Sequence, residues 1–406
     1  MLRYILVLIL FMHWGCSSKP DRVALQLAVE PMESPAAPNS GEPNLFADPS
    51  GRIYMSWIES RGEQEDALLF SVYEHGKWST PRLIARGDRW FVNWADFPSI
   101  IRLKNGTLVA HWLEKSGGAP YAYDVKMTFS RDNGESWSQP VSPHTDGTQT
   151  EHGFVSMLPW GEDRVFVTWL DGRKYAKKTN GEAPTHEMTI RAAVLDQAGN
   201  IEEAWLLDER TCDCCQTAAT PIPGGVLVAY RDRSPQEIRD ISYVRIQNGT
   251  ITKPAPVHAD GWTIPGCPVN GPALDSKGNT VAIAWFTMAN QTPSVKVAFS
   301  MDGGQTFAQP IRVDTGSPAG RVDVVLLSEQ ELIVSWLETT ENEAEIRIRK
   351  VRSDGQFSQA RTVARTSGSR ASGFPRMAFN GQELIFAWTE VGEPPRVRVA
   401  SARAHR

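Results

Sequence analysis

The chain has few cysteines, no basic run and only one long apolar stretch, and each of these absences excludes a class of protein. Only five of its 406 residues are cysteine, far fewer than a small disulfide-stapled scaffold carries. A formal charge of −5 without Lys/Arg-rich clusters argues against a nucleic-acid partner. No convincing amphipathic helical pattern occurs, and after residue 16 no segment is apolar enough for a transmembrane helix. These absences favour a large, mildly acidic all-β domain.

The long apolar stretch lies at the N-terminus. Arg3 precedes "YILVLILFM", which is too short to span a bilayer as a stable helix, and Cys16 follows where a signal peptidase would cut. The segment resembles a bacterial lipoprotein signal, which implies lipid on Cys16; an ordinary secretory peptide with an incidental cysteine is the alternative. We expect a signal peptide at 1–16, a tether at 17–21 and a single folded domain at 22–406.

Export also predicts location and redox state. We expect the protein at the cell envelope, facing the periplasm or as an outer-membrane lipoprotein, with membrane contact only through its lipid. Such a compartment is oxidising. Four cysteines remain for the folded domain.

One sequence phrase recurs seven times along the chain. It consists of a turn, an apolar strand and an aromatic anchor, commonly followed by an acidic residue, as in "GRIYMSWIE", "DRVFVTWLD" and "QELIVSWLE". The seven anchors are Trp57, Trp112, Trp169, Tyr230, Trp285, Trp336 and Trp388. They are spaced 51 to 61 residues apart, and a regular period near 50 is typical of a repeat architecture.

Each repeat holds four short strand patterns separated by turn residues, which predicts antiparallel sheets. Four strands repeated radially predict an all-β fold, a β-propeller of seven four-stranded blades, with six blades as the alternative. The last repeat lacks its fourth strand. We expect "RVALQLAV", residues 22–29, to supply it by pairing with 395–402 and closing the ring. Because the units bury their apolar faces against each other, they form one domain, and we expect a monomer.

Two near-identical turns occur 170 residues apart, "FSRDNGESWSQP" at 129–140 and "FSMDGGQTFAQP" at 299–310. Both fall between the third and fourth strands of a unit. Glycine supplies a positive φ there, and Asp132 and Asp302 can accept backbone N–H bonds. The pattern S-x-D-x-G-x-x-W resembles the Asp-box of the sialidase (neuraminidase) superfamily, with Phe for Trp in the second copy. In that family the box is structural, so the resemblance implies no catalytic role for these two aspartates.

The long polar loops of the units are predicted to share one face of the propeller. These are the loops between units and those between second and third strands. A funnel rich in polar and aromatic side chains is the usual ligand site, although long loops also collect polar residues without a function. The predicted ligand-binding residues are Trp90, Trp94, His152, Arg173, Arg233 and Trp262.

The sialidase resemblance implies a particular chemistry on that face. The family binds a substrate carboxylate with an arginine triad and uses a Tyr nucleophile, a Glu that activates it and an Asp acid/base. The candidates by position are Asp96, Tyr123, Glu151, Arg231, Arg321 and Arg370. The family's Arg-Ile-Pro motif is absent, since the equivalent stretch is "EPNLFAD". No residue therefore corresponds to the triad by motif, and structural ion pairs remain an equal explanation for the arginines.

The four remaining cysteines lie in two consecutive inter-unit loops, as "CDCC" at 212–215 and Cys267. In an oxidising compartment two disulfides among Cys212, Cys214, Cys215 and Cys267 are favoured. Thiolates that bind copper or zinc, with His152 or His258, are the alternative, although C-x-C-C is not the usual zinc spacing. No other cofactor is required.

These patterns leave two functions open. The first is an exported, sialidase-like glycan-processing enzyme, including exo-sialidase-type glycoside hydrolysis. The second is a non-catalytic propeller that holds a glycan, a peptide or a metal at the cell envelope. In both, the partner is a glycan or another small ligand in the funnel.

Overall fold

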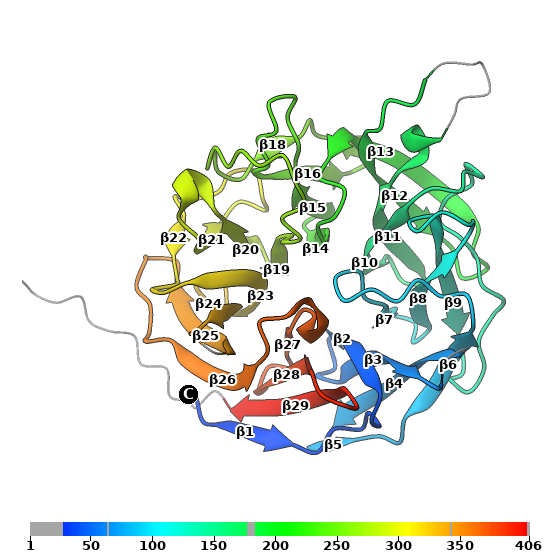
Figure 1. The fold of residues 1–406 in the computed structure, drawn as a ribbon, viewed down its shortest axis with the longest axis horizontal. Coiled ribbons are helices and arrows are strands. Elements are labelled where there is room, and N and C mark those ends of the chain that lie inside the picture. The colour runs from blue at the N-terminus through cyan, green and yellow to red at the C-terminus, as the bar shows by residue number, and fades with distance from the viewer. Residues whose placement is uncertain (1–26, 63–64, 177–182, 342, 404–406) are drawn as a thin grey trace, which may run out of the picture.

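The computed structural model describes residues 27–62, 65–176, 183–341 and 343–403. Seven small antiparallel sheets stand in a ring, with the chain passing from one sheet to the next around it (Figure 1). The predicted seven-bladed propeller is confirmed, and the six-bladed alternative is wrong. Helix is limited to short 3₁₀ turns, and none of the helices among the described residues is long and apolar enough to cross a membrane.

The strands of each blade are numbered in chain order, and the first strand of each lies nearest the ring centre (Figure 1). The first blade contains β2 (Ser40–Ala47), β3 (Ile53–Ser60), β4 (Asp66–Glu74), β5 (Lys77–Trp78) and β6 (Arg82–Gly87). The second contains β7 (Ser99–Arg102), β8 (Leu108–Lys115) and β9 (Tyr123–Ser130). The third contains β10 (His152–Trp160), β11 (Arg164–Asp171), η1 (Arg173–Tyr175), β12 (Met188–Leu195) and β13 (Ile201–Thr211).

The remaining four blades complete the ring. The fourth contains β14 (Ala218–Ile222), β15 (Gly225–Arg231), β16 (Ile241–Gln247), β17 (Thr250–Ile251) and β18 (Ala255–Pro256). The fifth contains β19 (Ala273–Lys277), β20 (Thr280–Thr287), η2 (Ala289–Gln291), β21 (Ser294–Ser300) and β22 (Ile311–Arg312). The sixth contains β23 (Pro318–Ser328), β24 (Glu331–Thr339), β25 (Ala344–Arg352) and β26 (Arg361–Thr366). The seventh contains η3 (Arg370–Ser372), β27 (Arg376–Phe379), β28 (Glu383–Glu390), β29 (Arg396–Arg403) and β1 (Val29–Met32).

The second strand of each blade is buried on both faces. In β20 every residue is buried, and in β3 all but the last residue are. The strand lies between two neighbouring sheets, so both of its faces meet apolar side chains. This explains why the recurring phrase is nearly continuous in apolar residues rather than strictly alternating. Alternation of buried and partly exposed residues appears in third strands such as β25, whereas the outer strand β13 is mostly exposed or partly exposed.

The acidic residue after the anchors Trp57, Trp169 and Trp336 has a structural purpose. In a strand, residues i and i+2 point to the same face, so the acid lies beside the buried indole. Trp57 donates to Glu59 over 2.8 Å and Trp336 donates to Glu338 over 2.6 Å. These bonds satisfy an N–H group that would otherwise be buried without a partner.

The core consists of seven apolar clusters, one at each interface between neighbouring blades. One cluster joins the fifth and sixth blades around Trp336, and another joins the first and seventh around Trp57. The other five occupy the remaining interfaces. No blade has a core of its own, which is why the repeats form a single unit.

The N-terminal segment closes the ring, as predicted, but with different residues. β1 pairs antiparallel with β29, placing Val29 opposite Ala402 and Met32 opposite Val399. Among the described residues the closing strand occupies Val29–Met32, so Val29 is the one predicted residue that lies in it; residues 22–26 of the prediction lie outside the described ones. Pro31 is compatible with it because β1 is the outermost strand of its blade.

The two Asp-box turns adopt the same geometry. Asp132 accepts bonds from the hydroxyl of Ser130 and the backbone N–H of Ser136, and Asp302 accepts the equivalent bonds from Ser300 and Thr306. In the first turn Gly134 has a φ of 89°, and a Cβ there would lie 2.4 Å from the Phe70 ring of the neighbouring blade. Glycine is therefore required both by conformation and by close approach.

Candidate active site

The loops predicted to share one face do meet there. Trp90, between the first and second blades, forms a β-bridge to Glu114 at the end of β8. Tyr123, the first residue of β9, forms a bridge to Glu151 in the next inter-blade loop. The loops between blades therefore contact the ends of strands that lead into the loops between second and third strands. These contacts bring many of the candidate residues together on one face of the ring.

Three candidate catalytic residues form one hydrogen-bonded group. Asp96, Tyr123 and Glu151 come from two inter-blade loops and the start of β9. The Tyr123 hydroxyl lies 2.9 Å from Glu151 Oε1 and 3.3 Å from Asp96 Oδ2. Its ring is buried and stacks on Phe91, with centroids 4.0 Å apart. Because a phenol has one proton, it can donate to only one of the two carboxyl groups at a time.

Burial keeps protons on both carboxyl groups near neutral pH. Burial raises the pKa of Asp96 to about 7, although bonds from the Phe154 amide and the Tyr123 hydroxyl act in the opposite direction. Burial also raises the pKa of Glu151 to about 8, against the Tyr123 bond, and the negative charge of Asp96 adds to the increase. The pKa of Tyr123 is raised well above its usual range by burial and by the two carboxyl groups. Groups that hold protons near the working pH suit acid/base chemistry.

A glycine makes room for this group. Gly153 lies in β10, and a Cβ built on it would stand 2.1 Å from Asp96 Oδ2 and 2.8 Å from the Tyr123 ring. The next residue, Phe154, has a φ of 54° and donates its amide to Asp96 over 2.8 Å. The irregular backbone in β10 therefore holds the Asp96 carboxylate in place.

His152 and Arg173 belong to an adjoining ion network and not to an open surface. His152 is fully buried and stacks on His144, with ring centroids 3.9 Å apart. Its Nε2 lies 3.2 Å from Asp146, and Arg173 binds Asp171 through two bonds of 2.6 Å. Burial disfavours the charged form of His152, but the bond to Asp146 and the charge of Asp171 outweigh it and raise its pKa.

Arg231 and Arg321 hold loops together. Arg231 is 2% exposed and donates to the backbone carbonyls of Asn270, Arg239 and Phe286. Arg321 donates to the Ser372 hydroxyl and to the carbonyls of Gly373 and Ser369. Both guanidinium groups therefore bond to neutral acceptors, and neither forms an ion pair with an acidic group among the described residues.

Arg370 differs from these two arginines. It is exposed at the start of η3. Burial, with the charge of Arg370 as a second cause, lowers the pKa of Arg321 to about 10. Arg370 is therefore near enough to Arg321 for their charges to interact, and Arg231 and Arg321 share Asn270 as a hydrogen-bond partner.

The predicted aromatic residues and Arg233 have mixed placements. Trp90 and Trp262 are buried, Trp90 against Trp112 and Trp262 beneath Arg231. Trp94 is partly exposed and lies under Arg321. Arg233 pairs with Glu237 over 2.8 Å. Of the six predicted ligand-binding residues, Trp94, Arg173 and Arg233 keep partial exposure.

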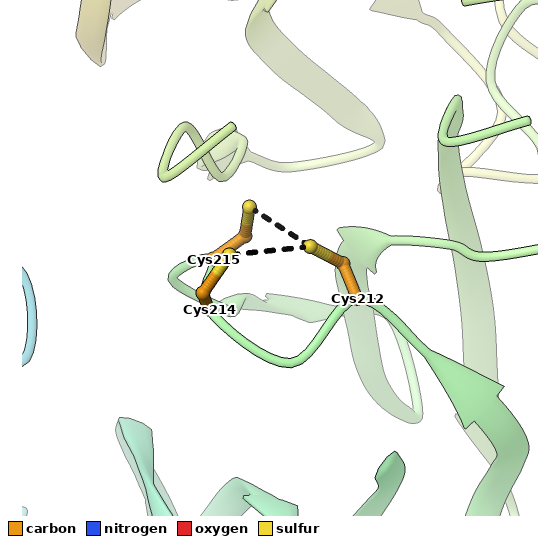
Figure 2. A group of neighbouring side chains, drawn as sticks. All are labelled: Cys212, Cys214 and Cys215. Atoms are coloured by element: carbon orange, nitrogen blue, oxygen red, sulfur yellow. Dashed lines mark hydrogen bonds between the residues drawn. The ribbon is translucent and has the colours of Figure 1, made fainter. Parts of the chain in front are cut away.

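The cysteines of the C-x-C-C motif converge on one point (Figure 2). Cys212 Sγ lies 3.3 Å from Cys215 Sγ and 3.7 Å from Cys214 Sγ. Cys267 is exposed, and its sulfur lies 3.6 Å from Asp213. All four are free thiols in this structure. Their sulfurs do not approach the roughly 2.05 Å of a disulfide bond, so the favoured pair of disulfides is not what the structure contains.

The cysteine loop lies near the tyrosine group. After burial and Asp96, the charges of Asp213 and Cys267 are further causes of the raised pKa of Glu151. The pKa of Tyr175 is likewise raised by burial and by Asp213 and Glu151. Both clusters therefore belong to the same electrostatic environment on the loop face.

Several residues of the site were not among the predicted ones. They are Phe91, Asp124, Asp146, Gly153, Asp171, Asp213 and Tyr175. Asp171 carries the clearest sequence signal, because it stands two positions after the anchor Trp169 and accepts its indole proton over 2.8 Å. The others depend on loop conformation, for which the residue pattern has no signal.

The chain matches no protein-family model and no curated protein sequence. Solved structures with a similar fold include a protein of unknown function from Dyadobacter fermentans, with 13% identity, coverage of 95% of this chain and 100% of that one, and a TM-score of 0.51. The polysaccharide lyase Uly1 has 8% identity, coverage of 90% of each chain and a TM-score of 0.53. A variant of the NanB sialidase from Streptococcus pneumoniae has 9% identity, coverage of 93% and 94%, and a TM-score of 0.47. At these identities the likeness shows the fold.

Proposed function

We propose that the protein is an exported glycan-cleaving enzyme with Tyr123, Glu151 and Asp96 as its reacting groups. One observation carries this proposal: a buried phenol is held between two carboxyl groups whose pKa values lie near 7 and 8. The fold adds support, since a polysaccharide lyase is among the propellers similar to this chain. A fold alone does not define an activity, so the proposal rests on the site.

The three groups can exchange protons in a productive order. Glu151 is the nearer carboxyl and, when ionised, accepts the proton of Tyr123, whose oxygen then acts as nucleophile or base. Because the pKa of Glu151 lies above that of Asp96, the reactive state, with Glu151 ionised and Asp96 protonated, is the less populated of the two singly protonated forms. Asp96, when protonated, supplies the proton that a leaving glycosidic oxygen needs. In sialidase-type hydrolysis the Tyr123 oxygen attacks the anomeric carbon while the glycosidic oxygen leaves with the Asp96 proton, and water then releases the sugar from Tyr123. In an elimination, the same oxygen removes a proton from the sugar ring while the glycosidic oxygen leaves with the Asp96 proton and a carbon–carbon double bond forms.

Glycan cleavage in general has more support than the exo-sialidase version of the proposal. A sialic acid carboxylate needs free guanidinium donors, and those of Arg231 and Arg321 are bonded to carbonyl and hydroxyl oxygens. Arg370 is the exposed member of the predicted triad.

The test is cleavage of a panel of polysaccharides and sialosides by the full-length protein. New reducing ends report any cleavage, and ultraviolet absorbance of an unsaturated product separates elimination from hydrolysis. Tyr123→Phe removes only the hydroxyl and should lower the rate about 10²- to 10⁴-fold. Tyr121→Phe is the matched control, because Tyr121 is 62% exposed and also contacts Phe91; its rate should stay within about twofold of wild type.

The alternative is a non-catalytic propeller that binds a glycan, a peptide or a metal. It would be favoured if the protein bound a glycan without cleaving it. Activity left intact in Tyr123→Phe would instead exclude Tyr123 as a reacting group. The cell-envelope location and the lipid on Cys16 belong to the proposal too. Labelled palmitate should enter the wild-type protein and not Cys16→Ser; equal labelling of both would exclude the lipid anchor at that residue.

A further inference from the structure

The C-x-C-C loop gathers three sulfur atoms in a small, largely buried volume. Cys212 and Cys215 are 1% and 2% exposed, whereas Cys214 is partly exposed and leaves a path for entry. All three sulfurs lie within 4.8 Å of one another. Sulfurs bound to one ion at about 2.3 Å stand about 3.8–4.0 Å apart. The observed separations of 3.3 and 3.7 Å need only a small adjustment to reach that geometry.

Two of the sulfurs already accept hydrogen bonds from fixed donors. Arg239 Nη1 lies 3.3 Å from Cys212 Sγ, and the backbone amide of Asn270 lies 3.4 Å from Cys215 Sγ. Donors of this kind orient and stabilise thiolate ligands in metal sites. A neutral structural thiol buried as a small apolar side chain does not require them.

These donors are held rigidly by the neighbouring blades. Asn270 accepts a bond from Arg231 at its carbonyl, and its side chain bonds to the Arg321 amide and the Ala319 carbonyl. The amide of Cys212 donates to the Arg231 carbonyl over 3.0 Å. The loop is therefore anchored on both sides before any ligand binds, as a preformed site requires.

We propose that Cys212, Cys214 and Cys215 bind one Cu(I) ion through three thiolates. The cluster supplies only sulfur, which is the ligand type that thiophilic ions such as Cu(I) and Zn(II) prefer. A structural zinc site takes four ligands, and here the fourth thiol, that of Cys267, lies beside Asp213 in a second group that shares only Cys214 with the first. Three sulfurs, with no fourth ligand in their own group among the residues that the structure describes, favour Cu(I). Binding would also keep the thiols from oxidation in an oxidising compartment.

The test is anaerobic titration of the full-length protein with Cu(I) against a competing Cu(I) chelator, and with Zn(II) against a zinc chelator. One Cu(I) should bind per chain, and X-ray absorption should show three sulfurs at about 2.3 Å. Cys214→Ser should weaken binding at least about 100-fold. Because Cys214 is partly exposed, this variant should keep its thermal stability without metal.

Two matched controls separate ligands from neighbours. Cys267→Ser makes the same chemical change outside the three-sulfur group and should leave the affinity for Cu(I) unchanged. Arg239→Gln should weaken binding about tenfold, whereas Arg233→Gln should not, since both arginines bind Glu237 but only Arg239 reaches a cysteine sulfur.

Two results would overturn the proposal. One is tight binding of Zn(II) through four sulfurs, lost in Cys267→Ser, with weak binding of Cu(I). The other is a disulfide between Cys212 and Cys214 or Cys215 in protein purified from the cell envelope, detected by mass spectrometry without reductant. Neither result would affect the test of glycan cleavage, because that test depends on Tyr123.

Discussion

The Asp-box turns and the inner loop face place the same chemical group in opposite environments. Bonds from Ser136 and Ser130 hold the pKa of Asp132 below its usual range. For Asp302, burial acts against the anion, but bonds from Thr306 and Ser300 bring its pKa down to about 2. Asp96 and Glu151 have few donors and a buried location, so their pKa values rise to about 7 and 8.

This difference separates residues that serve the fold from residues available for chemistry. The boxes occur twice with matching bonds because each fastens a turn to a neighbouring blade. The group around Tyr123 does not recur in the other blades, and its two carboxyl groups are poorly stabilised in their ionised form. Strain and unfavourable ionisation of this kind are typical of functional sites.

The largest expected effect comes from filling the space beside Asp96. Gly153→Ala would place a methyl group 2.1 Å from the carboxylate, displacing Asp96 and Tyr123 and costing about 1–3 kcal/mol of stability. Glycan cleavage should fall at least about 100-fold. Gly118→Ala is the control, since a Cβ there meets no atom within 4 Å. Thermal unfolding and activity measure both; equal behaviour of the two variants would show that the close contact has no consequence.

The next effect is a loss of stability with rising pH. A carboxyl group whose folded pKa is raised binds more protons in the folded state between its unfolded pKa and its folded pKa, so stability decreases as pH rises through that window. For Asp96 and Glu151 the window extends from about pH 4 to about 7–8. In wild type, this pair should lower the unfolding free energy by on the order of a few kcal/mol across that window. In the double variant Asp96→Asn and Glu151→Gln, this decrease should be absent.

Other buried carboxyl groups contribute to the same dependence, among them Glu42 and Asp275, with pKa values raised by burial to about 7 and about 6. The measured quantity is therefore the difference between wild type and the double variant across pH 5 to 8. Parallel curves would contradict the assignment of raised pKa values to this pair.

A smaller effect is expected at the turns. Ser130 is buried, and its hydroxyl donates to Asp132 and accepts the Gly134 amide. Ser130→Ala should cost about 1–2 kcal/mol by leaving that amide without a partner, and Ser300→Ala should cost the same. Denaturant unfolding gives both values. Neither variant should change glycan cleavage, and a loss of activity in either would remove the distinction between the two regions.

The smallest effect concerns acid stability. A carboxylate with a lowered pKa contributes stability that is present above its unfolded pKa and is lost as pH falls through the folded pKa. For Asp302 this window lies between about pH 4 and 2. Asp302→Asn should therefore lower the melting temperature slightly at pH 7 and not at pH 2. Because Asp302 is partly exposed, solvent screens its interactions, and a large change at neutral pH would contradict this account.

The fold was predictable because every blade must bury one strand between two neighbours. That requirement repeats apolar strands and aromatic anchors such as Trp57 and Trp285 at a regular spacing. Strand ends are less certain: the alternating residues 22–29 suggested the closing strand, whereas the structure uses Val29–Met32 despite Pro31.

The site was predictable only in part. Asp96, Tyr123 and Glu151 were selected by their positions and by the sialidase resemblance, and the structure places them in one hydrogen-bonded group. Arg231 and Arg321 show what the sequence could not predict. An arginine that bonds to three neutral acceptors and an arginine that is free to bind a substrate carboxylate can have the same neighbours in sequence. Loop conformation decides between the two.

The closing strand also sets the order in which the protein can fold. β1 is made early and β29 late, yet they pair directly. Contacts between such distant segments are slow to form, because a long loop must close first. Until then the seventh blade has an unpaired edge that another chain could occupy. We therefore expect refolding to be limited by this final pairing and to become more prone to aggregation as protein concentration rises.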